Sequence, residues 1–509
     1  MNFPRSAGVL LHPTALPGVW GMGEIGPQAR RFLHRLRDAA QTYWQVLPLG
    51  PTGYGDSPYQ SLSTFAGNPM LISFDDLLED GLLTEADLKL FPSFPPDRVD
   101  YGPVLEKRGE VLDLVCRAFD ARADKDLKNQ FAAYCSEQAE WLEDFSLFVA
   151  LKESHKLRPW PEWETELVQR EPHALEAARR QHAQAIQAVK IKQFLFARQW
   201  EVLRETARSA GVKLIGDIPI FVSHDSADVW ANQDLFSLDA AGHPTVVAGV
   251  PPDYFSATGQ LWGNPLYRWD VHAGEDYSWW MRRMRHMVAL VDIVRIDHFR
   301  GFEAYWEIPG GDETAENGKW VKGPGADFFQ VLQRTLGEIP VIAEDLGVIT
   351  EEVDLLRDAF DLPGMRILQF SFGEDLPPHL QPETFPENCV VYTGTHDNDT
   401  TRGWFWRAPG VDNTDTEEGI QEERQRVLEL VNTDGSQIHW DLIALAHRLP
   451  PHTAMIPLQD IMGLGSEARM NVPGKSQGNW SWRFREDALR DEDLKRLADI
   501  TRHFGRGRD

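Results

Sequence analysis

The segment IVRIDHFRG at residues 293–301 is an apolar run that ends in a cluster of charged and polar side chains. Short apolar runs of this kind, bounded by turn residues and separated by helical stretches, are typical of buried parallel strands joined by crossover helices. Eight such runs occur, at Gly8–Leu11, Trp44–Pro48, Lys213–Ile218, Ile293–Asp297, Val341–Glu344, Arg366–Phe370, Val390–Thr393 and Ala454–Pro457. The pattern predicts an α/β fold, a (β/α)8 TIM barrel.

The eight runs are unevenly spaced, and the long intervals predict insertions into a single catalytic barrel of residues 1–509. The interval after the second strand far exceeds one crossover helix and predicts a mainly helical insertion subdomain over about residues 66–205. The insertion of about residues 223–285, after the third strand, is rich in Gly, Pro, Asp and aromatic residues and lacks periodicity, which predicts long ordered active-site loops. No C-terminal domain rich in β-strands is expected.

Helical spacing inside the first insertion predicts individual helices over residues 76–91, 131–157 and 174–210. The last of these should end at Gly211, because glycine commonly terminates a helix.

Composition excludes several kinds of partner. The formal net charge of −27, from 78 acidic and 51 basic residues, disfavours nucleic acid and anionic membranes. The opening MNFPRSAGVLLHPTALPG lacks the features of a signal peptide, and no run reaches the ~20 apolar residues of a membrane span, so a cytoplasmic protein is predicted. Three cysteines without CxxC spacing predict neither a disulfide framework nor a zinc site.

Four predicted strands end in polar clusters, and the carboxyl ends of barrel strands build active sites. The clusters are GDIPIF (with Asp217), VRIDHFRG (with Arg295, Asp297, His298 and Arg300), IAEDLG (with Glu344 and Asp345) and YTGTHDNDT (with His396, Asp397, Asn398 and Asp399). Any one cluster alone is more simply explained as a polar strand end that caps a loop. Four in order predict that carboxylates converge at one mouth of the barrel.

Converging carboxylates indicate either a metal site or glycoside chemistry. Arg295 lies two residues before Asp297, hence on the same face of a strand, where it would keep Asp297 ionised as a nucleophile requires. Retaining glycosidases pair such a nucleophile with a protonated carboxyl, and Glu344 on the next strand fits that acid/base role, with a raised pKa. Asp397 would then stabilise the oxocarbenium-like transition state.

These motifs, with GDIPIFVSHDSADVW, TGYGDSPYQS and GVPPDYFSATGQLWGNP, resemble the amylomaltase (4-α-glucanotransferase) family, glycoside hydrolase family 77 of the α-amylase clan. The resemblance implies the same roles for Asp297, Glu344 and Asp397, and it implies no metal and no organic cofactor. It further implies sugar contacts from Tyr59, Asp217, Arg295 and His396, to which we add the neighbouring His298 as a candidate.

The resemblance also marks residues outside the four clusters. In similar enzymes the loop GVPPDYFSATGQLWGNP covers the cleft, so Asp253 and Trp262 would contact bound glucan; the alternative is that its aromatic residues only attach the loop to the barrel. Tyr54 and Tyr101 resemble an accessory glucan platform, or are ordinary tyrosines. Val222 stands where α-amylases have a His, which favours a transferase over a hydrolase.

The sequence therefore predicts transfer of an α-1,4-glucan segment to the 4-hydroxyl of another glucan or of glucose. An α-glucan hydrolase of the same clan and a non-catalytic glucan-binding protein remain alternatives. The expected partners are malto-oligosaccharides, starch or glycogen chains, and the expected assembly is a monomer or small homo-oligomer.

Overall fold

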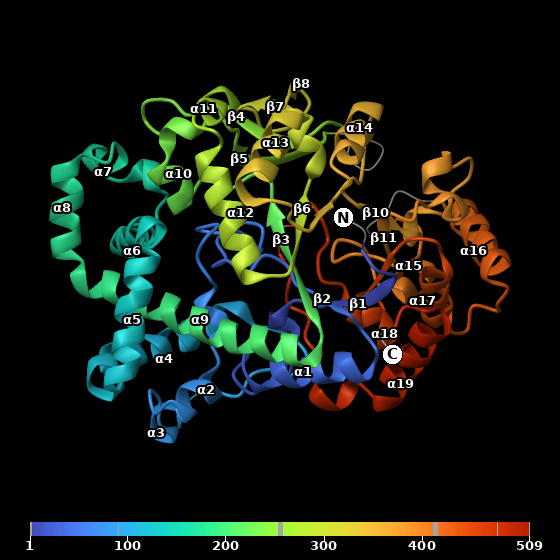
Figure 1. The fold of residues 1–509 in the computed structure, drawn as a ribbon, viewed down its shortest axis with the longest axis horizontal. Helices are drawn as coiled ribbons and strands as arrows, with labels where there is room; N and C mark the ends of the chain where they lie inside the picture. The colour runs from blue at the N-terminus through green and yellow to red at the C-terminus, as the bar shows by residue number, and fades with distance from the viewer. Residues whose placement is uncertain (1–2, 90, 253–257, 411–415, 476, 508–509) are drawn as a thin grey trace.

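Eight parallel strands form the central sheet of the computed structural model, which describes residues 3–89, 91–252, 258–410, 416–475 and 477–507 (Figure 1). The sheet order is β10-β11-β12-β1-β2-β3-β6-β9. The amide N of Ala343, at the end of β9, donates to the carbonyl of Pro363, just before β10, at 2.9 Å and brings the two edges of the sheet together. The strands are β1 (Ser6–Leu10), β2 (Tyr43–Gln45), β3 (Lys213–Pro219), β6 (Ile293–Asp297), β9 (Val341–Ala343), β10 (Gly364–Ile367), β11 (Cys389–Tyr392) and β12 (Thr453–Pro457).

This arrangement confirms the predicted TIM barrel, and each predicted strand is present with its ends within three residues. The largest differences are at β2, which ends early, and at β10, where Leu368–Phe370 form a 3-10 helix instead of a strand end.

Side-chain alternation along β6 separates the core from the site. Val294 and Ile296 are fully buried, while Arg295 and Asp297 take the positions between them. Arg295 Nε lies 3.4 Å from the sulfur of Met365 on β10, a strand that does not neighbour β6, so Arg295 points into the barrel interior. Register places Asp217 of β3 opposite Arg295.

The first insertion contains eight α-helices in the described residues and occupies the left and lower left of Figure 1. Each of the three helices predicted in this insertion is divided into two helices in the structure. Residues 76–91 are interrupted at Gly81 (φ +71°), residues 131–157 break at Gln138, and residues 174–210 break at His182. The helix end at Gly211 is as predicted, with φ +70°. The helices are α2 (Phe74–Glu79), α3 (Glu85–Leu88), α4 (Tyr101–Arg122), α5 (Lys125–Glu137), α6 (Ala139–Ser154), α7 (Thr165–Val168), α8 (Pro172–Gln181) and α9 (Ala183–Ala210).

The second insertion has more regular structure than the predicted loops. It contains α10 (Ala227–Ala231), β4 (Val246–Val250), β5 (Gln260–Pro265) and α11 (Trp269–Gly274). A four-stranded antiparallel sheet, in the order β5-β4-β7-β8, joins it to β7 (Ala304–Pro309) and β8 (Lys319–Lys322), at the top of Figure 1. An irregular register between β4 and β5 and a distant partner in β7 explain why no strand periodicity is visible there.

The remaining helices cover the outside of the barrel, and α19 returns to pack beside α1. No helix among the described residues is long and apolar enough to cross a membrane. These helices are α1 (Pro27–Asp38), α12 (Ser278–Leu290), α13 (Gly325–Leu336), α14 (Glu351–Ala359), α15 (Thr401–Phe405), α16 (Glu417–Val431), α17 (Ile438–Arg448), α18 (Leu458–Ile461) and α19 (Asp491–His503).

Candidate active site

Polar side chains from four barrel strands meet at one mouth of the barrel. Asp217 lies in β3, Asp297 is the last residue of β6, and Glu344 directly follows β9. The loop of residues 393–400 follows β11 and carries His396 and Asp397. All four strands are parallel, so their carboxyl ends open to the same side.

One guanidinium joins two of these carboxylates. Arg295 Nη1 donates to both Asp217 oxygens, at 2.7 and 2.6 Å, and Nη2 lies 2.9 Å from Asp297 Oδ1. The side chains of Arg295 and Asp217 are 4% and 0% exposed, whereas that of Asp297 is 30% exposed. Of these three side chains, Asp297 is therefore the one that is accessible from outside the protein. The contact predicted between Arg295 and Asp297 is present.

Glu344 is held against the peptide that follows Asp297. Its Oε2 accepts from the backbone N–H of His298 at 2.6 Å, and its Oε1 accepts from the N–H of Leu346 at 2.9 Å. Glu344 is 8% exposed. The Glu344 carboxyl is thus fixed in orientation next to the peptide that joins Asp297 to His298.

Burial raises the pKa of both Asp297 and Glu344, and Arg295 acts against the rise in both. Neighbouring carboxylates, Asp217 foremost, raise the pKa of Asp297 further, while the two backbone N–H bonds lower that of Glu344. The pair therefore keeps a proton to higher pH than separate carboxyls would. The rise at Glu344 is as predicted. Arg295 opposes protonation of Asp297, as predicted, while burial and the other carboxylates favour it.

Tyr59 links the strand-borne carboxylates to the loop after β11. Its hydroxyl donates to Asp217 Oδ2 at 2.7 Å, and its ring stacks on His396 with centroids 5.2 Å apart and planes at 15°. Burial lowers the pKa of His396, and the neighbouring Asp397 acts against this.

Asp397 is oriented from the far end of the chain. Its Oδ1 accepts from Asn471 Nδ2 at 2.6 Å, and its Oδ2 lies 3.4 Å from His396 Nε2. Its carbonyl accepts from Arg469 Nη2 at 2.7 Å. In the described ranges, no group of three His, Cys, Asp or Glu residues is placed to hold a metal ion, and the Arg295 guanidinium lies between Asp217 and Asp297.

Comparison with known proteins decides the family. The family model described as 4-α-glucanotransferase, glycoside hydrolase family 77, matches residues 11–489. The chain belongs to this family. A 4-α-glucanotransferase from Thermus thermophilus is 49% identical over 98% of both chains. The chloroplastic/amyloplastic 4-α-glucanotransferase of Solanum tuberosum is 42% identical over 99% of this chain and 87% of its own.

A solved structure agrees with the family model. The amylomaltase from Streptococcus agalactiae, in complex with acarbose, superposes with a TM-score of 0.94 and 36% identity over 99% of this chain and 100% of its own. The chain is accordingly a 4-α-glucanotransferase, an enzyme that transfers segments of α-glucans.

Trp262 and His298 lie together at the mouth of this glucanotransferase. Their rings meet edge to face, with centroids 4.8 Å apart. The Nε2 atom of His298 is buried and has no hydrogen-bond partner among the described residues, and burial lowers the pKa of His298 to about 3. Asp253, predicted in the same loop as Trp262, lies outside the described residues.

The predicted accessory pair is described only in part. Tyr54 lies in a 3-10 helix (Tyr54–Asp56), but its side chain is not among the described ones. Tyr101 begins α4, is partly buried, and its hydroxyl donates to the carbonyl of Trp480 at 2.9 Å. Trp480 in turn lies 6.0 Å from Tyr59. Tyr101 thus has a packing role next to the cleft, and its role as a glucan platform stays a prediction.

Sequence reasoning missed His12, Asn471 and Trp480. His12 directly follows the predicted first strand and is 6% exposed, with Nδ1 unpartnered among the described residues. Burial and the nearby His396 lower the pKa of His12 to about 3. The strand-end rule that found Asp217 would have found His12. Asn471 and Trp480 lie in the irregular segment between α18 and α19, where no periodic signal exists.

Proposed function

We propose that this glucanotransferase works by a retaining double displacement, with Asp297 as nucleophile, Glu344 as acid and then base, and Asp397 as stabiliser of the transition state. In the first step, Asp297 forms a bond to the anomeric carbon while Glu344 donates its proton to the glycosidic oxygen, and the reducing-end part leaves. In the second step, Glu344 takes the proton of an acceptor 4-hydroxyl, which attacks the anomeric carbon and releases Asp297.

The observation that carries this proposal is the placement of the two carboxyls. Asp297 is partly exposed and ion-paired to Arg295, and Glu344 is fixed on the amide of the residue after Asp297. The raised pKa values support a pair with one proton, which is the state that the first step requires: one carboxylate to attack and one acid to protonate the leaving group.

Contacts to the sugar are assigned to the groups around this pair. Asp217, Tyr59 and His396 form a connected polar wall, and Arg295 fixes its charged end. Sugar contacts from His298, Trp262 and Asp253, and an accessory platform of Tyr54 and Tyr101, complete the proposal. The Streptococcus agalactiae amylomaltase was solved in complex with acarbose, which supports a saccharide as the ligand.

The proposed substrates are malto-oligosaccharides and chains of starch or glycogen, with a second glucan or glucose as the acceptor. The proposal keeps three further expectations from the sequence. These are insertions with boundaries near residues 66–205 and 223–285, a cytoplasmic location, and assembly as a monomer or small homo-oligomer.

The first test is incubation with maltotriose alone, with the products resolved by length over time. Disproportionation should give glucose together with chains longer than maltotriose. Products that are only shorter than the substrate would instead establish hydrolysis. Asp297→Ala should lower turnover by at least about 10⁴-fold while glucan binding persists.

A trapping experiment tests the two roles separately. In Glu344→Gln the acid is lost, but α-maltotriosyl fluoride carries a leaving group that departs without protonation. The variant should therefore form the glycosyl-enzyme and stop there, and intact mass spectrometry should show one maltotriosyl group, which peptide mapping assigns to Asp297. The matched control, Asp297→Asn with the same fluoride, should show no added mass. A label on another residue would overturn the assignment of the nucleophile.

A further inference from the structure

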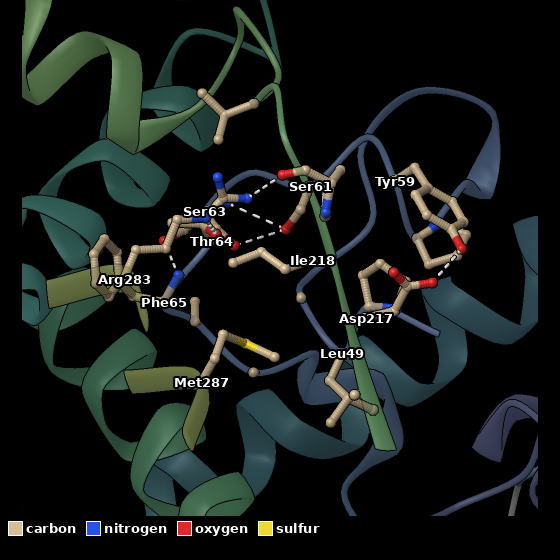
Figure 2. Close-up of a pocket in the computed structure, with 18 of the residues that line it drawn as sticks. Leu49, Tyr59, Ser61, Ser63, Thr64, Phe65, Asp217, Ile218, Arg283 and Met287 are labelled. Carbon is tan, nitrogen blue, oxygen red and sulfur yellow. Dashed lines mark hydrogen bonds between the residues drawn. The ribbon is translucent and has the colours of Figure 1, made fainter. Parts of the chain in front are cut away.

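Arg283 is a buried guanidinium behind the polar wall that Asp217, Tyr59 and His396 form. It lies on α12, remote in sequence from β3, which carries Asp217, and from the loop of residues 57–67, here the Tyr59 loop. Only 1% of Arg283 is exposed. Figure 2 shows Arg283 and the Tyr59–Asp217 hydrogen bond around one pocket, on opposite sides of the view.

Arg283 forms hydrogen bonds with both segments that carry Tyr59 and Asp217. Its Nε donates to Thr64 Oγ1 of the Tyr59 loop at 2.6 Å. Its Nη2 and Nη1 donate to the carbonyls of Pro219 and Ile220, the residues that follow Asp217, at 2.6 and 3.2 Å. The amide N of Thr64 donates in turn to the buried carboxylate of Asp228 at 2.8 Å, which fixes the loop at the same point.

The acceptors of Arg283 are neutral, which makes its burial informative. Within the described part of the chain it forms no ion pair with a carboxylate; its other close contacts include the ring of Trp280, 4.5 Å away, and the hydroxyl of Tyr267, 3.5 Å away. Burial lowers the pKa of Arg283, and the nearby buried carboxylate of Asp228 acts against this without forming a direct ion pair. Removing a guanidinium from water is costly, and an apolar side chain would fill the same space with less penalty. The fixed fork of donors, which only arginine offers, is the feature that these contacts use.

Packing alone does not set the spacing between the Tyr59 loop and β3. A cavity of about 50 Å³ lies between them, lined by Leu49, Tyr59, Asp217, Ile218 and Arg283 among others. Side chains of the loop and the strand therefore do not pack directly against each other across this space. The hydrogen bonds of Arg283 span the two segments beside this space.

We propose that Arg283 is a positioning residue, which holds Tyr59 and Asp217 in register by bridging Thr64 to the backbone at the end of β3. The inference rests on the proposed sugar contacts of Tyr59 and Asp217. Interactions with the sugar that strengthen in the transition state require this alignment, whereas initial binding of a long glucan depends on many other contacts. Loss of Arg283 should therefore lower kcat more than it raises KM.

The test compares Arg283→Met with wild type in the maltotriose assay. Methionine fills similar space without a donor. We expect kcat to fall about 10²-fold, the loss expected for a misplacement of about 1 Å, with KM changed less than about threefold. Arg283→Lys, which keeps one charged donor, should recover part of this loss. Met287→Ala, which truncates an apolar side chain of the same pocket and helix, is the matched control: it should lower the melting temperature and leave kcat within about twofold.

A double-mutant cycle with Tyr59→Phe separates positioning from general destabilisation. If Arg283 acts through the Tyr59–Asp217 contact, Arg283→Met should cost much less in kcat once that contact is already lost. If the fold-losses in kcat of the two single variants multiply in full in the double variant, Arg283 does not act through Tyr59 and the proposal is overturned. Should Arg283→Met fail to fold, Thr64→Val decides, because it removes one bond of the bridge without a change in shape. A tenfold smaller kcat at unchanged KM would support the bridge, and unchanged kcat would refute it.

A different result is expected if the proposed sugar contacts of Tyr59 and Asp217 are themselves wrong. If Tyr59→Phe and Asp217→Asn leave kcat unchanged, the sugar contacts themselves are wrong. If those two variants lose activity while a folded Arg283→Met does not, only the positioning role is refuted.

Discussion

Asp217, Arg295 and Asp297 lie within regular strands and hold one another directly, whereas His396 and Asp397 lie in a loop that is held from outside. We call the first group the strand half of the site and the second group the loop half. In the strand half, the buried Arg295 guanidinium bridges both carboxylates. The loop half is fixed by residues more than 50 positions away, through Asn471 on Asp397 and through Asp460 on the loop ends. The strand half should therefore respond to a change of charge, and the loop half to a change of position.

Loss of Arg295 is the largest effect expected from this comparison. Arg295→Met leaves the buried Asp217 and the partly exposed Asp297 without their shared counterion, and should lower kcat by about 10²- to 10³-fold. The free energy of unfolding should fall by about 3–5 kcal/mol, the usual loss when one partner of a buried ion pair is removed. Both are measurable, in the maltotriose assay and by urea denaturation. A folded variant within tenfold of wild-type kcat would break the distinction between the halves.

The pH dependence sharpens the same point. The active state has one proton on the Asp297–Glu344 pair, so activity should rise with pH as the first proton leaves and fall as the second leaves. Both pKa values are raised by burial, so both limbs should lie above the ordinary carboxyl range near pH 4. Arg295 lowers both pKa values, and therefore Arg295→Met should move both limbs of kcat/KM to higher pH. Limbs at the wild-type pH would contradict this electrostatic role.

The strand half was predictable from sequence, and so was the barrel. Buried parallel strands are continuous apolar runs, and the period of two that aligns Arg295 with Asp297 is a local property. The breaks at Gln138 and His182 were not predictable, because neither segment contains glycine or proline there and tertiary packing sets the bend. The β5-β4-β7-β8 sheet escaped prediction because the register between β4 and β5 is irregular and because β4 pairs with β7, which is distant in sequence.

In the loop half, the residues that support the site could not be predicted from the sequence. The motif YTGTHDNDT marked His396 and Asp397 as polar, but nothing in it indicates Asn471 or Asp460 as their supports. Those partners approach only after the chain has folded. Likewise, the stacking of Tyr59 on His396 joins residues from two loops, and only the resemblance to a family placed Tyr59 at the site.

Asp460 is the test of the loop half, with an intermediate effect. Its carboxylate accepts from the Thr393 hydroxyl at 2.6 Å, and from the amide N and hydroxyl of Thr401 at 2.6 and 2.8 Å, so it ties both ends of the loop. Asp460→Ala leaves buried donors unpaired and should lower the free energy of unfolding by about 3 kcal/mol. Because His396 and Asp397 lose their fixed position, kcat should fall about 10- to 10²-fold.

The pH profile separates this effect from that of Arg295. Asp460→Ala should leave both limbs at the wild-type pH, since no charge next to the Asp297–Glu344 pair has changed. Asp460→Asn, which retains an oxygen for the Thr401 amide, is the control and should keep most of the activity. A shifted profile in Asp460→Ala would show that the two halves are coupled electrostatically.

Tyr101 gives the smallest expected effect and decides between two roles. Tyr101→Phe removes the hydroxyl that donates to Trp480, which should lower the free energy of unfolding by about 1 kcal/mol and change maltotriose turnover less than about twofold. Tyr101→Ala removes the ring as well. If the ring is an accessory glucan platform, KM should rise for amylose and remain unchanged for maltotriose, because only a long chain can reach the cleft and the platform together. An equal change with both substrates would instead show that Tyr101 supports the cleft through Trp480 and Tyr59, as a further member of the loop half.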